Sequence, residues 1–265
     1  MGYSGHGPAH VRKSATGAAA GGEAVARETA GVRYLLRRST RARRLRLVLD
    51  REGIPLVTLP VRAPARLADE FVESRQDWIG RQRVRFAADR ERHRARGPLG
   101  DGGTVDFSGQ PHRLEVRGPT TARRTRVEHD DTDGPVIRVW ISRADERPLP
   151  VVLEAWLRRE ARGAIGRRLA ARAPQLGVSP ASVSIRDQRT RWGSASRRGR
   201  LSFSWRLVLA PPAVLDYVVV HELAHLVVFG HPPGFWTLVR SVVPDADRAR
   251  RWLRDHAREL HWSLE

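Results

Sequence analysis

The segment from Pro212 to Phe229 constrains the fold of this chain more than any other. It begins with proline, which is favoured in a first helical turn because its missing N–H would be unpaired there. Apolar residues follow at helical spacing: Val214, Leu215, Val218, Val219, Leu223, Leu226 and Val227. Because a helix turns by about 100° per residue, His221 and His225 lie one turn apart on the same face. The sequence therefore predicts a helix over residues 212–229 that presents two imidazoles together in apolar surroundings.

The residues His221, Glu222 and His225 form a His-Glu-x-x-His motif, which is typical of a zinc hydrolase. Imidazoles and a carboxylate in an apolar helix are costly to bury without a partner, and a metal ion is such a partner. Glu222 points about 100° away from His221, where it is placed to act as general base on a metal-bound water. The alternative is an ordinary buried histidine pair. A carboxylate is expected to orient each histidine, with three candidates: Asp216, Asp245 and Glu259.

His231 is the candidate third ligand. Gly230 is suited to a left-handed conformation that ends the helix, and Pro232 and Pro233 stiffen the turn that follows. Catalytic zinc sites keep three protein ligands and one open position, and this chain has no cysteine to offer. We therefore expect one Zn²⁺ ion, although manganese and nickel also accept imidazole ligands. The alternative is that His231 caps the helix C-terminus, where the helix dipole favours an imidazolium.

Several segments around this motif carry a family resemblance. They are Arg37-Arg38-Ser39, Arg191-Trp192-Gly193-Ser194, residues 201–206 (LSFSWR), Leu209-Ala210-Pro211-Pro212, residues 216–226, His231 and Phe235-Trp236. With them the chain resembles the YgjP-like metallopeptidase family, a minimal zincin related to SprT-like and WLM-type proteins, over about residues 30–260. The resemblance implies an α+β, zincin-like metallopeptidase domain whose active-site helix packs on a small antiparallel sheet, preceded by a β-rich N-terminal module. It also implies zinc-dependent hydrolysis of peptide bonds, with a protein or peptide as substrate.

Two positions depart from the family pattern. Ala195 stands where members usually have cysteine, and Ser204 stands where they have asparagine. Both positions are expected in the region of the cleft, so the departures affect contacts that line it. The absence of cysteine at position 195 argues against a cysteine-based role for the loop around it. In the same region Arg191 and Trp192 are the candidates for substrate contacts, the alternative being a surface arginine and a packed tryptophan.

Composition and alternation divide the chain into three parts. Residues 1–31 are rich in Gly, Ala and Ser with little aliphatic content, which is typical of a disordered tail. Residues 32–145 predict a β-rich module of short antiparallel strands and a hairpin or meander, with one amphipathic helix over about residues 64–89. Residues 146–265 hold the histidine motif and are predicted to form the metallopeptidase domain.

Within this last part, helices are predicted over residues 148–172, 233–242 and 245–260. Residues 183–186 and 201–206 predict a hairpin that lies against the active helix, with its edge along the cleft. An extended peptide could pair with such an edge by strand addition. Apolar side chains of the last two helices are expected to pack behind the active helix: Phe235, Trp236, Val239, Trp252 and Leu253.

The formal net charge of +19 favours contact with phosphate, but its distribution does not. Nearly all the basic residues are arginine, with Lys13 the one lysine, and they spread from Arg33 to Arg258. Nucleic-acid binding is therefore not the favoured reading. No apolar stretch is long enough to span a membrane, and the N-terminus lacks the apolar core of a signal peptide. We expect a cytoplasmic protein, in agreement with the absence of cysteine.

Three classes of function stay open. The first is a zinc peptidase acting on a protein or peptide. The second is a metal-dependent hydrolase of phosphoric anhydrides, whose arginines would bind the charge of a nucleotide. The third is a DNA-associated, SprT-like protease or a non-enzymatic binding module, which the basic composition would also allow. The sequence gives no indication of the oligomeric state.

Overall fold

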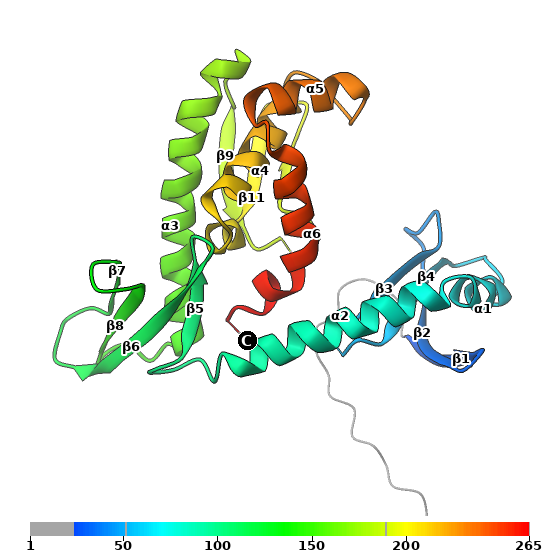
Figure 1. Cartoon of the computed structure of the whole chain (residues 1–265), viewed down its shortest axis with the longest axis horizontal. Coiled ribbons are helices and arrows are strands. Elements are labelled where there is room, and N and C mark those ends of the chain that lie inside the picture. The colour runs from blue at the N-terminus through cyan, green and yellow to red at the C-terminus, as the bar shows by residue number, and fades with distance from the viewer. Residues whose placement is uncertain (1–23, 51, 189, 265) are drawn as a thin grey trace, which may run out of the picture. The chain divides into compact units, whose positions relative to one another are not determined.

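The computed structural model describes residues 24–50, 52–188 and 190–264. The chain divides into two compact units between Ala88 and Asp89. Both helices and strands are present throughout, so the fold is α+β, as predicted (Figure 1). None of the helices in the described ranges is long and apolar enough to cross a membrane.

The first unit is a four-stranded sheet with helices packed on it. Its elements are β1 (Val25–Thr29), β2 (Val32–Ser39), β3 (Arg46–Leu49), β4 (Pro55–Pro60), α1 (Arg66–Glu73) and the first part of α2 (Gln76–Ala95). The strand order is β1-β2-β4-β3, in which β2 and β4 are parallel and the other pairs are antiparallel. The expectation of antiparallel strands alone is therefore wrong. The core joins side chains of both layers: Tyr34, Leu36, Val57, Leu59, Ala68, Val72 and Ile79.

Two further expectations for the first unit need correction. Strand β1 lies within residues 1–31, where a disordered tail was predicted, and pairs with β2 through a turn at Ala30 and Gly31. An edge strand buries few side chains, so its sequence carries a weak apolar signal. Residues 1–23 of that tail lie outside the described residues. The single helix predicted over residues 64–89 is two helices, separated at Ser74, whose hydroxyl donates to the Phe71 carbonyl.

The second unit contains two sheets and four complete α-helices among its described residues. The first sheet consists of β5 (Thr104–Phe107), β6 (Gln110–Thr120), β7 (Arg126–Asp130) and β8 (Val136–Ser142). Its order is β5-β6-β8-β7, with β6 and β8 parallel, so it is not a simple hairpin or meander. The second sheet has β9 (Ser182–Arg186), β10 (Gly193–Ala195) and β11 (Arg200–Ser204) in the order β10-β11-β9. The helices are α3 (Leu149–Arg172), α4 (Pro212–Ala224), α5 (Pro233–Val242) and α6 (Ala246–Trp262).

The predicted domain boundary after residue 145 falls between β8 and α3, inside this second unit. Leu114 and Ile137 of the first sheet belong to the same buried cluster as Trp156 of α3 and Leu223 of α4. The first sheet thus shares its core with the helices that follow.

Helix α4 is the centre of the second unit. It contacts α3, α5, α6 and strand β10, and Figure 1 shows it between α3 (green) and α6 (red). Val219, Val220 and Leu223 are completely buried. A helix that is covered on several sides is apolar all round rather than on one stripe, which is the pattern of its sequence.

Two predictions around α4 were wrong. Residues 183–186 and 201–206 do not form a hairpin: β9 and β11 are parallel, and β10, from the segment between them, pairs antiparallel with the other side of β11. The strand that contacts α4 is therefore the edge strand β10, and the small sheet is mixed rather than antiparallel. Helix α4 ends at Ala224 instead of Phe229, because the amides of Leu226 and Val227 bond three residues back and tighten the turn.

Candidate metal centre

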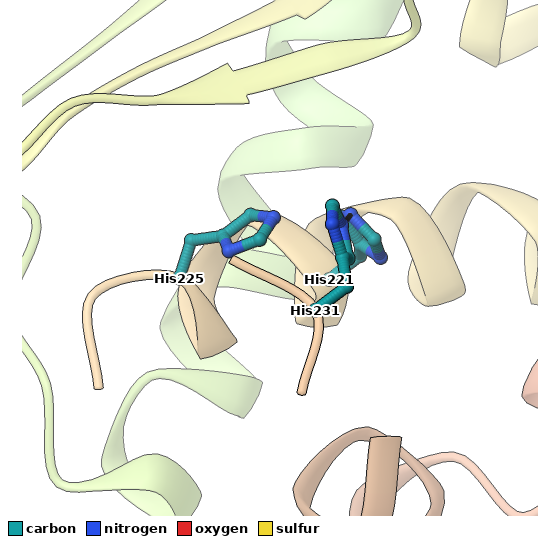
Figure 2. A group of neighbouring side chains, drawn as sticks. All are labelled: His221, His225 and His231. Carbon is teal, nitrogen blue, oxygen red and sulfur yellow. Dashed lines mark hydrogen bonds between the residues drawn. The ribbon is translucent and has the colours of Figure 1, made fainter. Parts of the chain in front are cut away.

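The three predicted ligands lie together at the end of α4 (Figure 2). His221 is in the last turn of the helix, and His225 is its C-cap with helical φ and ψ of −67° and −15°. His221 and His225 are therefore still one helical turn apart, although α4 ends at Ala224. Gly230 has a φ of 81°, and the chain turns there to bring His231 to the other two rings. One nitrogen of each ring lies within 4.8 Å of the others, and the Nε2 atoms of His221 and His231 are 3.2 Å apart.

The protonation pattern of these rings fits a metal ion. The Nδ1 of His225 faces the carbonyl oxygen of Val228 at 3.3 Å, so its proton lies there and Nε2 carries the lone pair. Burial lowers the pKa of His221 to about 3, and the charges of His225 and His231 would act in the same direction. Burial also lowers the pKa of His225. Neutral imidazoles are the form that binds metal, and nitrogens around tetrahedral zinc lie about 3.3 Å apart, close to the His221–His231 spacing.

Two aromatic side chains of α5 hold the imidazoles in place. The ring of Phe235, which is completely buried, stacks on His225 with centroids 4.5 Å apart and also contacts His221 and His231 by its edge. The ring of Trp236 stacks on His231 at 5.5 Å. We expected both residues to pack behind the active helix, but they contact the candidate ligands directly.

Two of the three carboxylates considered as orienting partners pair with arginines. Asp216 accepts from Arg172 at 2.7 Å, and Glu259 accepts from Arg92 at 2.7 Å. Asp245 occupies the N-cap position of α6 but makes no side-chain capping bond. The histidines instead contact neutral oxygens: the Tyr217 hydroxyl lies 3.5 Å from Nδ1 of His221, and the Val228 carbonyl faces His225. Tyr217 is one turn before His221 on the same helix, a spacing that could have identified it.

Glu222 is buried beside the histidines, with only 5% of its surface exposed. Its carboxylate lies directly against the backbone of Gly193 in β10. Burial raises the pKa of Glu222 to about 7, while the positive charge of Arg191 acts in the opposite direction. The carboxyl group is thus held in a confined position between the edge strand and the histidine pair.

Comparison with known proteins shows the family of this chain. The model of the YgjP-like metallopeptidase domain matches residues 43–256. The chain belongs to the YgjP-like metallopeptidase family. This confirms the predicted family and its metallopeptidase domain.

Two other comparisons add little. A search of curated proteins found no match. The crystal structure of the metallopeptidase zymogen of Pyrococcus abyssi abylysin is 24% identical, with 34% of this chain and 92% of that chain covered and a TM-score of 0.31. That overlap is too slight to bear on the site of this YgjP-like domain.

A cavity of about 480 Å³ opens beside His221 and Glu222 in this YgjP-like domain. The two predicted substrate residues, Arg191 and Trp192, both line it. Tyr217 contributes from α4, and Arg250 and Arg254 contribute from α6. The two α6 arginines were missed because the sequence of α6 reads as a solvated charged face. The cavity is thus lined by apolar residues and by three arginines. The charge of Arg191 acts on Glu222, whereas the Arg254 guanidinium also pairs with Asp255 and that of Arg250 lies over the Trp236 ring.

Proposed function

We propose that this protein is a zinc-dependent metallopeptidase in which His221, His225 and His231 hold one Zn²⁺ ion and Glu222 is the general base. The observation that carries the proposal is the convergence of three imidazoles with a buried carboxylate beside them. Membership of a metallopeptidase family supports the same reaction class. Zinc is proposed because three imidazoles are a common donor set of catalytic zinc sites. Manganese and nickel also accept imidazole ligands.

The roles of the side chains follow from their positions. When bound, zinc supplies Lewis-acid activation of water and of the peptide carbonyl. Glu222 takes a proton from the attacking water while the water oxygen forms a bond to the carbonyl carbon. The same carboxyl group then gives that proton to the amide nitrogen as the C–N bond breaks. Because Gly193 leaves no side chain in the way, Glu222 stays close to the place where both transfers occur.

The edge strand β10 is the proposed binding site for the substrate main chain. Within residues 24–50, 52–188 and 190–264 no strand pairs with its side away from β11, and it contacts α4 next to the candidate base. An extended peptide can add to such an edge by backbone hydrogen bonds. Arg191 and Trp192 come directly before β10 and line the cavity, so we propose that they contact substrate side chains.

The test is a Glu222→Gln variant, examined for metal content and for turnover on the same preparation. We expect zinc content equal to that of the wild type and a loss of peptide cleavage by about 10²-fold or more, since general-base catalysis contributes on that scale. Glu146→Gln, at an exposed position, is the matched control and should retain activity. Full activity in the Glu222→Gln variant would show that another group is the base.

The arginine-lined cavity also favours a second candidate, hydrolysis of phosphoric anhydrides in a nucleotide. Arg191, Arg250 and Arg254 could together bind its charge. Phosphate release from nucleotides, measured beside peptide cleavage on one zinc-loaded sample, separates the two reactions. Peptide cleavage that requires DNA and falls steeply with salt would instead indicate a DNA-associated protease.

A further inference from the structure

A second group of metal-binding side chains lies on the sheet β5-β6-β8-β7, apart from the histidines of α4. We propose that His112, His129 and Asp131 hold a divalent transition-metal ion. His112 is on β6, His129 is on β7, and Asp131 directly follows β7. One ligand atom of each residue lies within 4.8 Å of the others.

The hydrogen bonds of His112 call for a cation at this place. The side chain is buried, with 3% of its surface exposed, and its Nδ1 lies 2.9 Å from the carbonyl oxygen of Gln110. A carbonyl oxygen only accepts, so Nδ1 carries the proton and Nε2 of the neutral ring carries a lone pair. That nitrogen faces Oδ1 of Asp131 at 3.3 Å, and a carboxylate oxygen is also an acceptor. Two acceptors that face each other need a positive charge between them, which is either a second proton on the ring or a metal ion.

The geometry favours the metal ion. Oδ1 of Asp131 lies 3.3 Å from Nε2 of His112 and 2.8 Å from Nε2 of His129. Ligand atoms around tetrahedral zinc lie about 3.3 Å apart. The His112–Asp131 pair has that spacing, the His129–Asp131 pair is closer, and all three atoms lie within 4.8 Å of one another. A bond from Nδ1–H to a backbone carbonyl is also the usual way in which a metal-binding histidine is oriented.

The surroundings provide both a rigid support and access for the ion. The rings of His112 and His129 lie 5.6 and 4.8 Å from the ring of Phe107, which in turn packs on Trp156 of the core. On the other side, the Asp131 side chain is 64% exposed. An ion can therefore enter from solvent, and a water molecule can complete its coordination.

This donor set indicates the class of ion and its role. Two imidazoles and one carboxylate suit zinc, nickel, cobalt or copper rather than calcium or magnesium. Strands β6 and β7 are not neighbours, since β8 lies between them. A metal ion here would join β6 to the turn after β7 and stabilise the sheet. The proposal does not depend on the function proposed for His221, His225 and His231.

The test uses the full chain with His221→Ala and His225→Ala, which remove two of the three candidate ligands at α4. We expect this variant to retain about one zinc ion per chain after dialysis and to melt at a higher temperature with zinc than without it. Adding His129→Gln or Asp131→Asn should abolish both effects. Asp133→Asn, an exposed change two residues beyond Asp131 in the same turn, is the matched control and should preserve them.

A parallel measurement covers the case in which the double variant does not fold. The wild-type chain should then bind about two zinc ions, falling to about one in His129→Gln and staying at about two in Asp133→Asn. Zinc binding that is unchanged by both His129→Gln and Asp131→Asn would overturn the proposal. So would a folded His221→Ala, His225→Ala chain that binds no zinc, because Asp131 would then simply pair with a protonated His112.

Discussion

Gly193 and Glu222 lie so close that no side chain fits between them. A Cβ atom at Gly193 would come within 2.6 Å of both Cγ and Oε1 of Glu222. Neither group has room to move easily, since β10 is fixed to β11 and Glu222 is buried in α4. The glycine is therefore what allows the edge strand to approach the candidate base.

Replacing this glycine tests that relationship. We expect Gly193→Ala to displace the Glu222 carboxylate and to lower kcat by about 10²-fold, a loss comparable with removal of a general base. Zinc content should be unchanged, because the histidines are not displaced. Gly166→Ala, at an exposed helical position with open space around it, is the control and should leave kcat unchanged. A Gly193→Ala enzyme with normal kcat would mean that Glu222 can shift without consequence.

Removing the third histidine tests the metal centre. We expect His231→Ala to weaken zinc binding by more than about tenfold and to lower activity in proportion, since the remaining site would have only two protein ligands. Metal content after dialysis against a mild chelator measures the change. His93→Ala is the control, because the His93 ring contacts Trp262 in a tilted arrangement and is not among the candidate ligands. Equal zinc affinity in both variants would favour the helix-capping role for His231.

The arginines of the cavity lead us to expect a preference for acidic side chains near the cleaved bond. A charged hydrogen bond contributes about 1.5–3 kcal/mol, so Arg254→Ala should lower kcat/KM for an acidic peptide by about tenfold or more. The value for the matching amide peptide should change little. Arg251→Ala is the control, because this exposed neighbour does not line the cavity. Equal losses on both peptides would indicate a structural role for Arg254.

The first unit is expected to lose stability in acid through Asp69. Burial opposes the charge of this carboxyl, but hydrogen bonds from Tyr34 and Arg27 outweigh it and lower its pKa. A lowered folded-state pKa gives stability that is present above the unfolded pKa of about 3.9 and is lost as the pH falls through the folded pKa.

Asp69→Asn should therefore destabilise the chain by about 1–3 kcal/mol at neutral pH, and by progressively less below about pH 4. Thermal melting of the full chain across this range measures the difference. Glu70→Gln is the control, because its contact with Arg66 is long and exposed. A difference between Asp69→Asn and wild type that does not change with pH would contradict this account.

The parts of the site that depend on local spacing could be predicted from the sequence. The positions of His221, Glu222 and His225 follow from the geometry of one helix, and Gly230 indicates where the chain turns back. Their roles as ligands and base stay predictions. The strands were harder, because the partner and direction of a strand depend on contacts far away in the sequence. The parallel pairing of β9 with β11, and hence the place of Gly193 against Glu222, has no local signal.

Longer-range packing explains the other differences. The sequence of residues 146–265 gives no sign that β5 to β8 share their core, since that cluster joins residues more than 100 positions apart, such as Leu114 and Leu223. The sequence of α6 does not show which of its arginines line the cavity, because this depends on how α6 packs against α4. His112 and His129 are likewise separated in the sequence by the rest of β6 and the turn before β7. Only the folded sheet brings them together.

Phe235 supplies no ligand, yet its ring touches all three imidazoles at the end of α4. We therefore expect retention of the proposed zinc ion to be coupled to the packing of α5. A core substitution in that helix, such as Val239→Ala, should speed zinc release even though it lies outside the coordination sphere. The rate of metal exchange would then report on how stably α5 packs against the rest of the unit.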